Sequence, residues 1–145
     1  MRIRISMSTA RRVLVITWFS FLLLDVSLIF YLYFDGWIEE DSFRAALQQL
    51  NASYAPYVGA ITLYYWASVR KDHRQTGQAG TAFTLAWLSS VLWNGVLVAF
   101  LLPLLFQSGT IENSVEQIRY IGSMFSWLVA GAIGYYFASP TSSPG

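Results

Sequence analysis

Long apolar stretches that are nearly free of charge dominate the pattern of this chain. In the first of them, residues 13–34, Asp25 is the only charged residue. At about 1.5 Å per residue, a helix of this length crosses a hydrocarbon core roughly 30 Å thick. Its many leucine, isoleucine, valine and phenylalanine side chains gain about 0.3–0.6 kcal/mol each, which together outweighs the roughly 2.5–3.5 kcal/mol cost of one central Asp. The pattern therefore predicts a first transmembrane helix over 13–34.

Three further apolar stretches follow, over 53–69, 81–107 and 114–138. Pro56 falls in the first turn of the second stretch, where a helix tolerates proline, and Pro103 indicates a kink or break near the outer end of the third. Asn113 and Glu116 have capping-box spacing, so the fourth helix starts ahead of its apolar part. None of the stretches shows the alternation of a barrel strand. The expected fold class is all-α: a polytopic membrane protein whose single domain, 1–145, is a bundle of four transmembrane helices.

The connection between the first two stretches has a helical pattern of its own. Four apolar side chains recur at helical spacing: Phe43, Ala46, Leu47 and Leu50. Polar residues occupy the opposite face, and the acids at 39–41 suit the N-terminus of a helix. We expect a short amphipathic interfacial helix over 42–50 that rests on lipid headgroups. The alternative is an outer vestibule whose acids attract cations. The last residues, 139–145, are rich in Pro, Ser and Gly and are expected to be a disordered tail.

Composition supports a membrane protein and excludes several other classes. The chain is 55% hydrophobic, 17% aromatic and only 12% charged, against about 25% charged in soluble domains. A net charge of +1 with scattered basic residues argues against nucleic acid as a partner. There is no cysteine and a single histidine, His73, so no metal site is expected. The chain also lacks the HExxH, GxSxG and phosphate-loop motifs, and we expect neither a cofactor nor enzyme activity.

Basic residues set the expected orientation. Seven of the nine lysines and arginines precede the first stretch or follow the second, and only Arg44 and Arg119 fall on the other side. The positive-inside rule then places both termini in the cytoplasm, with a bacterial inner membrane as the expected location. Basic side chains at this inner face are expected to contact the headgroups of the lipid bilayer. The candidates are Arg11, Arg12, Arg70, Lys71 and Arg74.

Small residues recur every fourth position in two of the stretches. The fourth stretch contains Gly122, Ser126, Ala130 and Gly134, and the third contains Ala82, Ala86 and Ser90. Such faces let helix backbones approach closely, which matters because lipid offers no hydrophobic drive between helices. We expect them to pack helices within one bundle, or alternatively to join subunits in a homo-oligomer.

Polar groups near the middle of the bilayer are the main candidates for function. Asp25 and Asn94 lie at similar depth in helices that run in the same direction, and Thr62 falls at a comparable level. An ionised carboxylate there is costly, which favours a protonated Asp25 that donates to Asn94. Three interpretations stay open: a structural clasp between Asp25 and Asn94, a pore-lining or proton-binding carboxylate in an oligomer, and a pairing with a basic residue of a different membrane protein.

The length and the four-span layout resemble small phage-exclusion membrane proteins of the RexB type and compact transmembrane effectors of bacterial antiphage systems, which perturb ion gradients. No motif is shared, so no residue role is transferred. The resemblance implies an oligomeric channel or pore-type protein that alters ion permeability, in antiphage defence. One alternative is a non-catalytic accessory or assembly subunit of a larger membrane complex. The other is a small proton-coupled transporter that uses Asp25, because four short helices with an acid in the first resemble the small multidrug resistance family. That family has a Glu in the first helix and tight loops, which this chain lacks.

Overall fold

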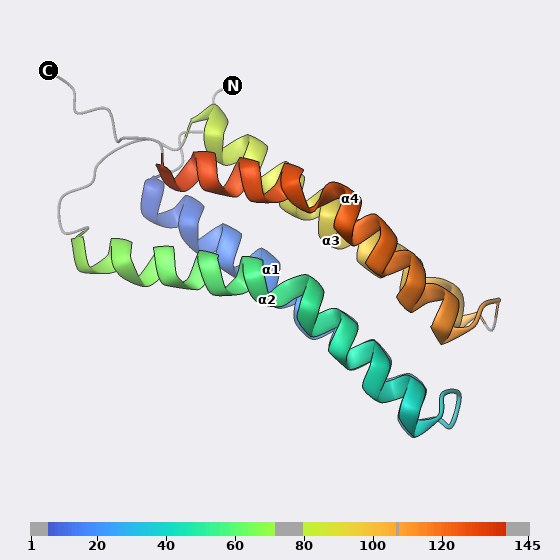
Figure 1. Cartoon of the computed structure of the whole chain (residues 1–145). Helices are drawn as coiled ribbons and strands as arrows, with labels where there is room; N and C mark the ends of the chain where they lie inside the picture. Colours follow the sequence, from blue (N-terminus) through green and yellow to red (C-terminus); the bar gives the residue numbers. More distant parts are fainter. Residues whose placement is uncertain (1–5, 72–79, 107, 139–145) are drawn as a thin grey trace, which may run out of the picture.

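The computed structural model describes residues 6–71, 80–106 and 108–138, and this part of the chain folds into four α-helices. They are α1 (Met7–Phe34), α2 (Glu40–Lys71), α3 (Thr81–Leu105) and α4 (Ile111–Ala138). Figure 1 shows two long antiparallel hairpins, one made by α1 and α2 and the other by α3 and α4. The all-α fold class is confirmed. Arg74 and the predicted tail 139–145 lie outside the described residues.

The four helices form a closed ring in cross-section. α1 packs against α2 and α3, and α4 packs against the same two helices. Within the described ranges the backbone of α1 does not come close to that of α4, nor that of α2 to that of α3, so these pairs are diagonally opposite. α1 and α3 are therefore parallel neighbours, as are α2 and α4. The centre of the ring is a single core to which every helix contributes.

α2 replaces two predicted elements with one. The interfacial helix expected over 42–50 and the span expected over 53–69 are parts of one continuous helix, Glu40–Lys71, with Pro56 inside it rather than in its first turn. The reason is a stripe of buried residues spaced three or four apart, which runs unbroken through the expected boundary. Its members are Ala46, Leu50, Tyr54, Tyr57 and Ile61. The apolar face of 42–50 thus packs into the bundle instead of onto lipid.

The ends of the helices follow local chemistry. α1 is capped by Ser6, whose Oγ accepts from the N–H of Thr9, and the chain turns after α1 at Gly36, where φ is +77°. α3 ends two residues after Pro103. α4 begins at Ile111, where the hydroxyl of Thr110 accepts from the N–H of Asn113 at 3.4 Å. Hydroxyl caps and a left-handed glycine are the usual signals for such ends.

Apolar side chains cover much of the outer surface. Two helical segments, Ser8–Phe34 and Thr81–Leu105, are long and apolar enough to cross a membrane, and only 22% and 33% of their most apolar windows are buried. Core helices of soluble proteins bury such windows, and monomeric soluble proteins rarely expose continuous apolar surface. These two helices therefore indicate association with a membrane.

The predicted small-residue faces divide between the core and the surface. Ala86 and Ser90 of α3 are fully buried, and Ala82 is half-buried. In α4, Gly122 lies against the Trp93 ring and Ser126 is half-buried, whereas Ala130 and Gly134 are exposed. Gly122 and Ser126 of α4 thus pack within the bundle, whereas Ala130 and Gly134 face outward.

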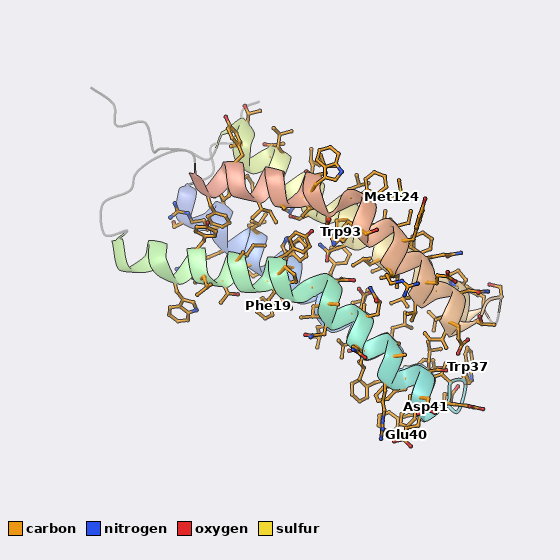
Figure 2. The ribbon with its side chains drawn as sticks, in the orientation of Figure 1. Phe19, Trp37, Glu40, Asp41, Trp93 and Met124 are labelled. Atoms are coloured by element: carbon orange, nitrogen blue, oxygen red, sulfur yellow. The ribbon has the colours of Figure 1, made fainter. Side chains whose placement is uncertain are left out.

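A hydrogen bond joins the two hairpins at the end of the bundle where α1 connects to α2. The hydroxyl of Ser42 in α2 donates to Oε1 of Glu112 in α4 at 2.6 Å. Figure 2 shows that Glu40, Asp41 and Trp37 lie at this same end, beside the connection between α1 and α2. A hydrogen bond to the charged carboxylate lowers the pKa of Glu112 below its ordinary value.

Replacing Gly122 with leucine should destabilise the bundle by about 1–3 kcal/mol, because the added atoms overpack a filled site. A Cβ at this position lies 3.6 Å from Cη2 of Trp93, so alanine is tolerated and larger side chains collide. Gly134→Leu is the matched control, since a Cβ there meets nothing within 4 Å. Thermal unfolding in detergent measures the difference, and equal stability of the two leucine variants would contradict the packing.

Ser42→Ala should remove a pH-dependent part of the stability. The folded pKa of Glu112 is lowered, so its contribution is present above the ordinary carboxyl pKa and is lost as the pH falls through the lowered value. The gap in unfolding temperature between wild type and Ser42→Ala should therefore shrink on acidification from neutral pH. A gap that stays constant down to strongly acidic pH would argue against this hydrogen bond.

Candidate functional site

A carboxyl group is fully enclosed at the centre of the bundle. Asp25 in α1 is 0% exposed, and its Oδ2 accepts a hydrogen bond of 2.5 Å from the phenol of Tyr54 in α2. Its other oxygen, Oδ1, is buried and has no hydrogen-bond partner. Asp25 therefore faces the inside of one chain, not its outer surface.

Trp18 connects this pair to α3. Its indole N–H donates to Oγ of Ser90 at 2.9 Å, and the Ser90 hydroxyl donates in turn to the carbonyl of Ala86. The indole ring meets Tyr54 edge to face at 5.9 Å and stacks on Tyr57 at 5.1 Å between ring centroids. Aromatic pairs at these separations and angles are favourable beyond the area that they bury. Three helices meet at this one side chain.

Tyr57 extends the cluster to the fourth helix. Its hydroxyl donates to the backbone carbonyl of Ser126 in α4 at 2.9 Å, and its ring contacts Trp93 of α3 edge to face. Hydrogen bonds donated by Trp18, Tyr54 and Tyr57 thus link all four helices. We call this set the central cluster. Its members are Trp18, Asp25, Tyr54, Tyr57, Ser90, Trp93, Asn94 and Ser126.

Asn94 is buried in the same core but is not the partner of Asp25. Its amide nitrogen donates to the carbonyl of Ser90, one turn earlier in its own helix, at 2.6 Å. Its Oδ1 is buried without a hydrogen-bond partner, and so is the hydroxyl oxygen of Thr62. The expected clasp between Asp25 and Asn94 is thus replaced by the bond between Asp25 and Tyr54.

Tyr54 was not predicted as a partner of Asp25, because the second helix was expected to start at residue 53 rather than at Glu40. With a span starting at 53, Tyr54 lies at the membrane edge, far in depth from Asp25. With α2 starting at Glu40, the same residue lies near the middle of a longer helix. The four-residue spacing from Ala46 through Leu50 to Tyr54 places it on the inward face, and it could have been found from that spacing.

No basic side chain in the described part of the chain forms a salt bridge with Asp25. The ion pair of Arg44 with Glu40 lies on an exposed face in the first turns of α2. A single hydroxyl donor on a buried carboxyl leaves its ionised form poorly compensated. The described residues also include no group of three or more His, Cys, Asp or Glu that could hold a metal ion.

The basic residues expected at the inner headgroups differ in exposure. Arg12 is exposed, whereas Arg11 is only 9% exposed and faces the bundle. Arg70 and Lys71 are the last two residues of α2. Headgroup contact of Arg12 stays a prediction, and its exposure is compatible with it.

No protein-family model, no curated protein and no solved structure matches this chain. Any functional assignment therefore depends on the geometry of the chain itself.

Tyr54→Phe should destabilise the bundle by about 1–3 kcal/mol, because Asp25 loses its donor while staying buried. The double variant Asp25→Val with Tyr54→Phe should recover most of that loss, since both polar partners are then gone. Tyr31→Phe, at an exposed position of α1, is the matched control and should leave stability unchanged. Thermal unfolding in detergent tests the set, and a Tyr54→Phe variant as stable as wild type would refute the bond.

Proposed function

We propose that this chain is an integral membrane protein with four spanning helices, in which Asp25 and Tyr54 form an intramembrane proton-binding site that serves ion permeation or proton-coupled transport. The observation that carries the proposal is the fully buried, uncompensated carboxyl of Asp25. Ionisable residues inside membrane helices are costly and mark ion and proton pathways.

Spanning by α2 and α4 is supported by the absence of charge and by outward apolar groups. No charged residue occurs from Ala45 to Val69 or from Tyr120 to Phe137. Leu63 and Trp127 are 73% and 70% exposed on the outer faces of α2 and α4. The tyrosines, tryptophans and glycines of these segments lower their mean hydropathy, yet such residues are frequent in transmembrane helices. Both helices also lie alongside the two more apolar ones over the length of the bundle.

Proton binding is supported by the chemistry around Asp25. The ionised form is disfavoured in hydrocarbon, whereas the neutral acid keeps the bond from Tyr54 and leaves an O–H for a further acceptor. The unpartnered Oδ1 of Asn94, which is fully buried in the same core, is an acceptor of that kind. Because Asp25 faces the interior of one chain, a path that includes it runs through a single bundle. Oligomerisation would bring several such bundles together.

Flux in liposomes tests the proposal. Wild-type protein should carry protons or small cations across the membrane, and Asp25→Asn should lose most of this flux because the amide cannot bind and release a proton. Asp35→Asn, at an exposed position after α1, is the matched control and should retain the flux. Equal flux of Asp25→Asn and wild type, or wild-type protein that is inert to ions, would reject the proposal.

In cells, phage plating on bacteria that express wild type or Asp25→Asn tests the suggested role in antiphage defence.

A second candidate function is that of an assembly subunit in a larger membrane complex. It is favoured by a surface of small residues on α4. Ala130 is exposed there, and a Cβ added at Gly131 or Gly134 meets nothing within 4 Å. A partner helix can approach such a face closely. Loss of a co-purifying membrane subunit in Gly134→Leu, with flux absent in every variant, would favour this candidate over the first.

A further inference from the structure

A groove with a largely polar lining lies between α2 and α4. Its volume of about 220 Å³ has room for several water molecules at about 30 Å³ each. Six of the ten described residues that line it carry a hydroxyl, amide or guanidinium group: Gln49, Ser53, Tyr57, Arg119, Ser123 and Ser126. A second hollow, of about 290 Å³ between α3 and α4, differs in its chemistry, because among the described residues that line it only Ser89 carries such a group. Polar side chains thus gather at one of the two hollows beside α4.

Two hydrogen bonds between α2 and α4 fix the level of the groove. Ser42 bonds to Glu112 and Tyr57 bonds to Ser126, and the partners are 70 and 69 residues apart in the sequence. Each α2 residue of the groove therefore lies beside the α4 residue about 70 positions later. Gln49 comes two turns before Tyr57, so the groove extends about 12 Å along the helices at about 1.5 Å per residue.

The deeper end of the groove lies beside the buried acid. Tyr57 lines the groove and stacks on Trp18. The ring of Trp18 also meets that of Tyr54, which donates to Asp25. Ser53 of the groove directly precedes Tyr54 in α2, so the groove and the acid are at the same level. Contacts therefore lead from the groove to the acid through the aromatic rings of the central cluster.

The other end of the groove carries a charge that requires water. Arg119 is exposed, and no salt bridge or hydrogen bond joins it to another described residue. It is the last charged residue before the uncharged stretch 120–137, which places it at the outer boundary of the proposed span. A guanidinium at the edge of hydrocarbon is costly unless water reaches it. The amide of Gln49 donates to Ser53 at 3.5 Å, and its second N–H is left for water.

We propose that this groove is a water-filled inlet that opens at the outer face, ends at Tyr57 and supplies protons to Asp25. The hydroxyls of Ser123 and Ser126 donate to carbonyls of their own helix and keep their lone pairs for water. Lipid chains in the groove would leave these acceptors unpaired. The step at its deeper end is transfer of a proton from a hydronium ion to the carboxylate of Asp25, which leaves a water molecule. The inference rests on the proposed function, because it needs both the four spans and the proton site.

Thiol labelling in proteoliposomes tests the inlet, because the chain has no cysteine of its own. Ser123→Cys should react with a membrane-impermeant sulfonated methanethiosulfonate added outside, since the reactive form of a thiol is the thiolate, which needs water. Met124→Cys is the matched control, because Met124 is the next residue of α4 and is 49% exposed but does not line the groove. Its thiol faces lipid and should react roughly tenfold more slowly. Asp35→Cys, just after α1, measures the fraction of molecules whose outer face is accessible.

The labelling has two outcomes that reject the inlet. An unreactive Ser123→Cys would overturn it. Equal reaction of Ser123→Cys and Met124→Cys would overturn it together with the four-span arrangement, because this face of α4 would then not lie in lipid.

Proton flux before and after labelling provides a second measurement. Labelling of Ser123→Cys should remove most of the flux of this variant, because the attached group fills the groove. Labelled Asp35→Cys is the control and should keep its flux. Flux that survives complete labelling of Ser123→Cys would overturn the inlet. A wild type without flux would reject the proposed function and the inlet with it, whereas wild-type flux combined with an unreactive Ser123→Cys would reject the inlet alone.

Discussion

The constraint on which this structure depends is that polar side chains of an externally apolar bundle have only its interior in which to find partners. Leu63, Trp127 and many other large side chains face outward, so hydroxyl, carboxyl and indole groups turn toward the axis. There many of them bond to one another or to backbone carbonyls, although Oδ1 of Asp25 and Oδ1 of Asn94 have no partner. The bonds from Tyr54 to Asp25 and from Trp18 to Ser90 are fully enclosed examples. Without such partners each buried polar group would cost free energy comparable to a lost hydrogen bond.

The central cluster also explains how a ring of four helices keeps a common core. Its aromatic side chains fill the space near the axis, where small residues alone would leave a void. Trp18 spans from α1 to Ser90 in α3, and Tyr57 spans from α2 to the backbone of α4. Each contact joins helices that are neighbours in the ring, so the aromatic groups both fill the centre and fix the relative rotation of the helices.

Much of this architecture was predictable from residue order, and the exceptions have identifiable causes. α1 and α3 are so apolar that composition locates them, although α1 begins at Met7 rather than at 13 and α3 ends at Leu105 rather than at 107. α2, in contrast, changes from amphipathic to apolar near Asn51 and contains Pro56. Composition therefore suggested a boundary where the backbone has none. Depth along a helix also follows from counting residues, which is why Asp25 and Asn94 were expected at one level. Rotation about the helix axis does not follow from counting. Asn94 therefore bonds to its own helix, and Asp25 bonds to a tyrosine that was expected at the membrane edge.

The ring arrangement has a consequence for how the buried acid can meet water. Asp25 and Tyr54 belong to the same hairpin, while the bonds of Trp18 to Ser90 and of Tyr57 to Ser126 join one hairpin to the other. If the two hairpins move apart as rigid bodies, the second pair of bonds breaks and the first survives. The acid would then be hydrated while its tyrosine donor still holds it in place, so the packing of α1 on α3 and of α2 on α4 would govern the access of water to the carboxyl group.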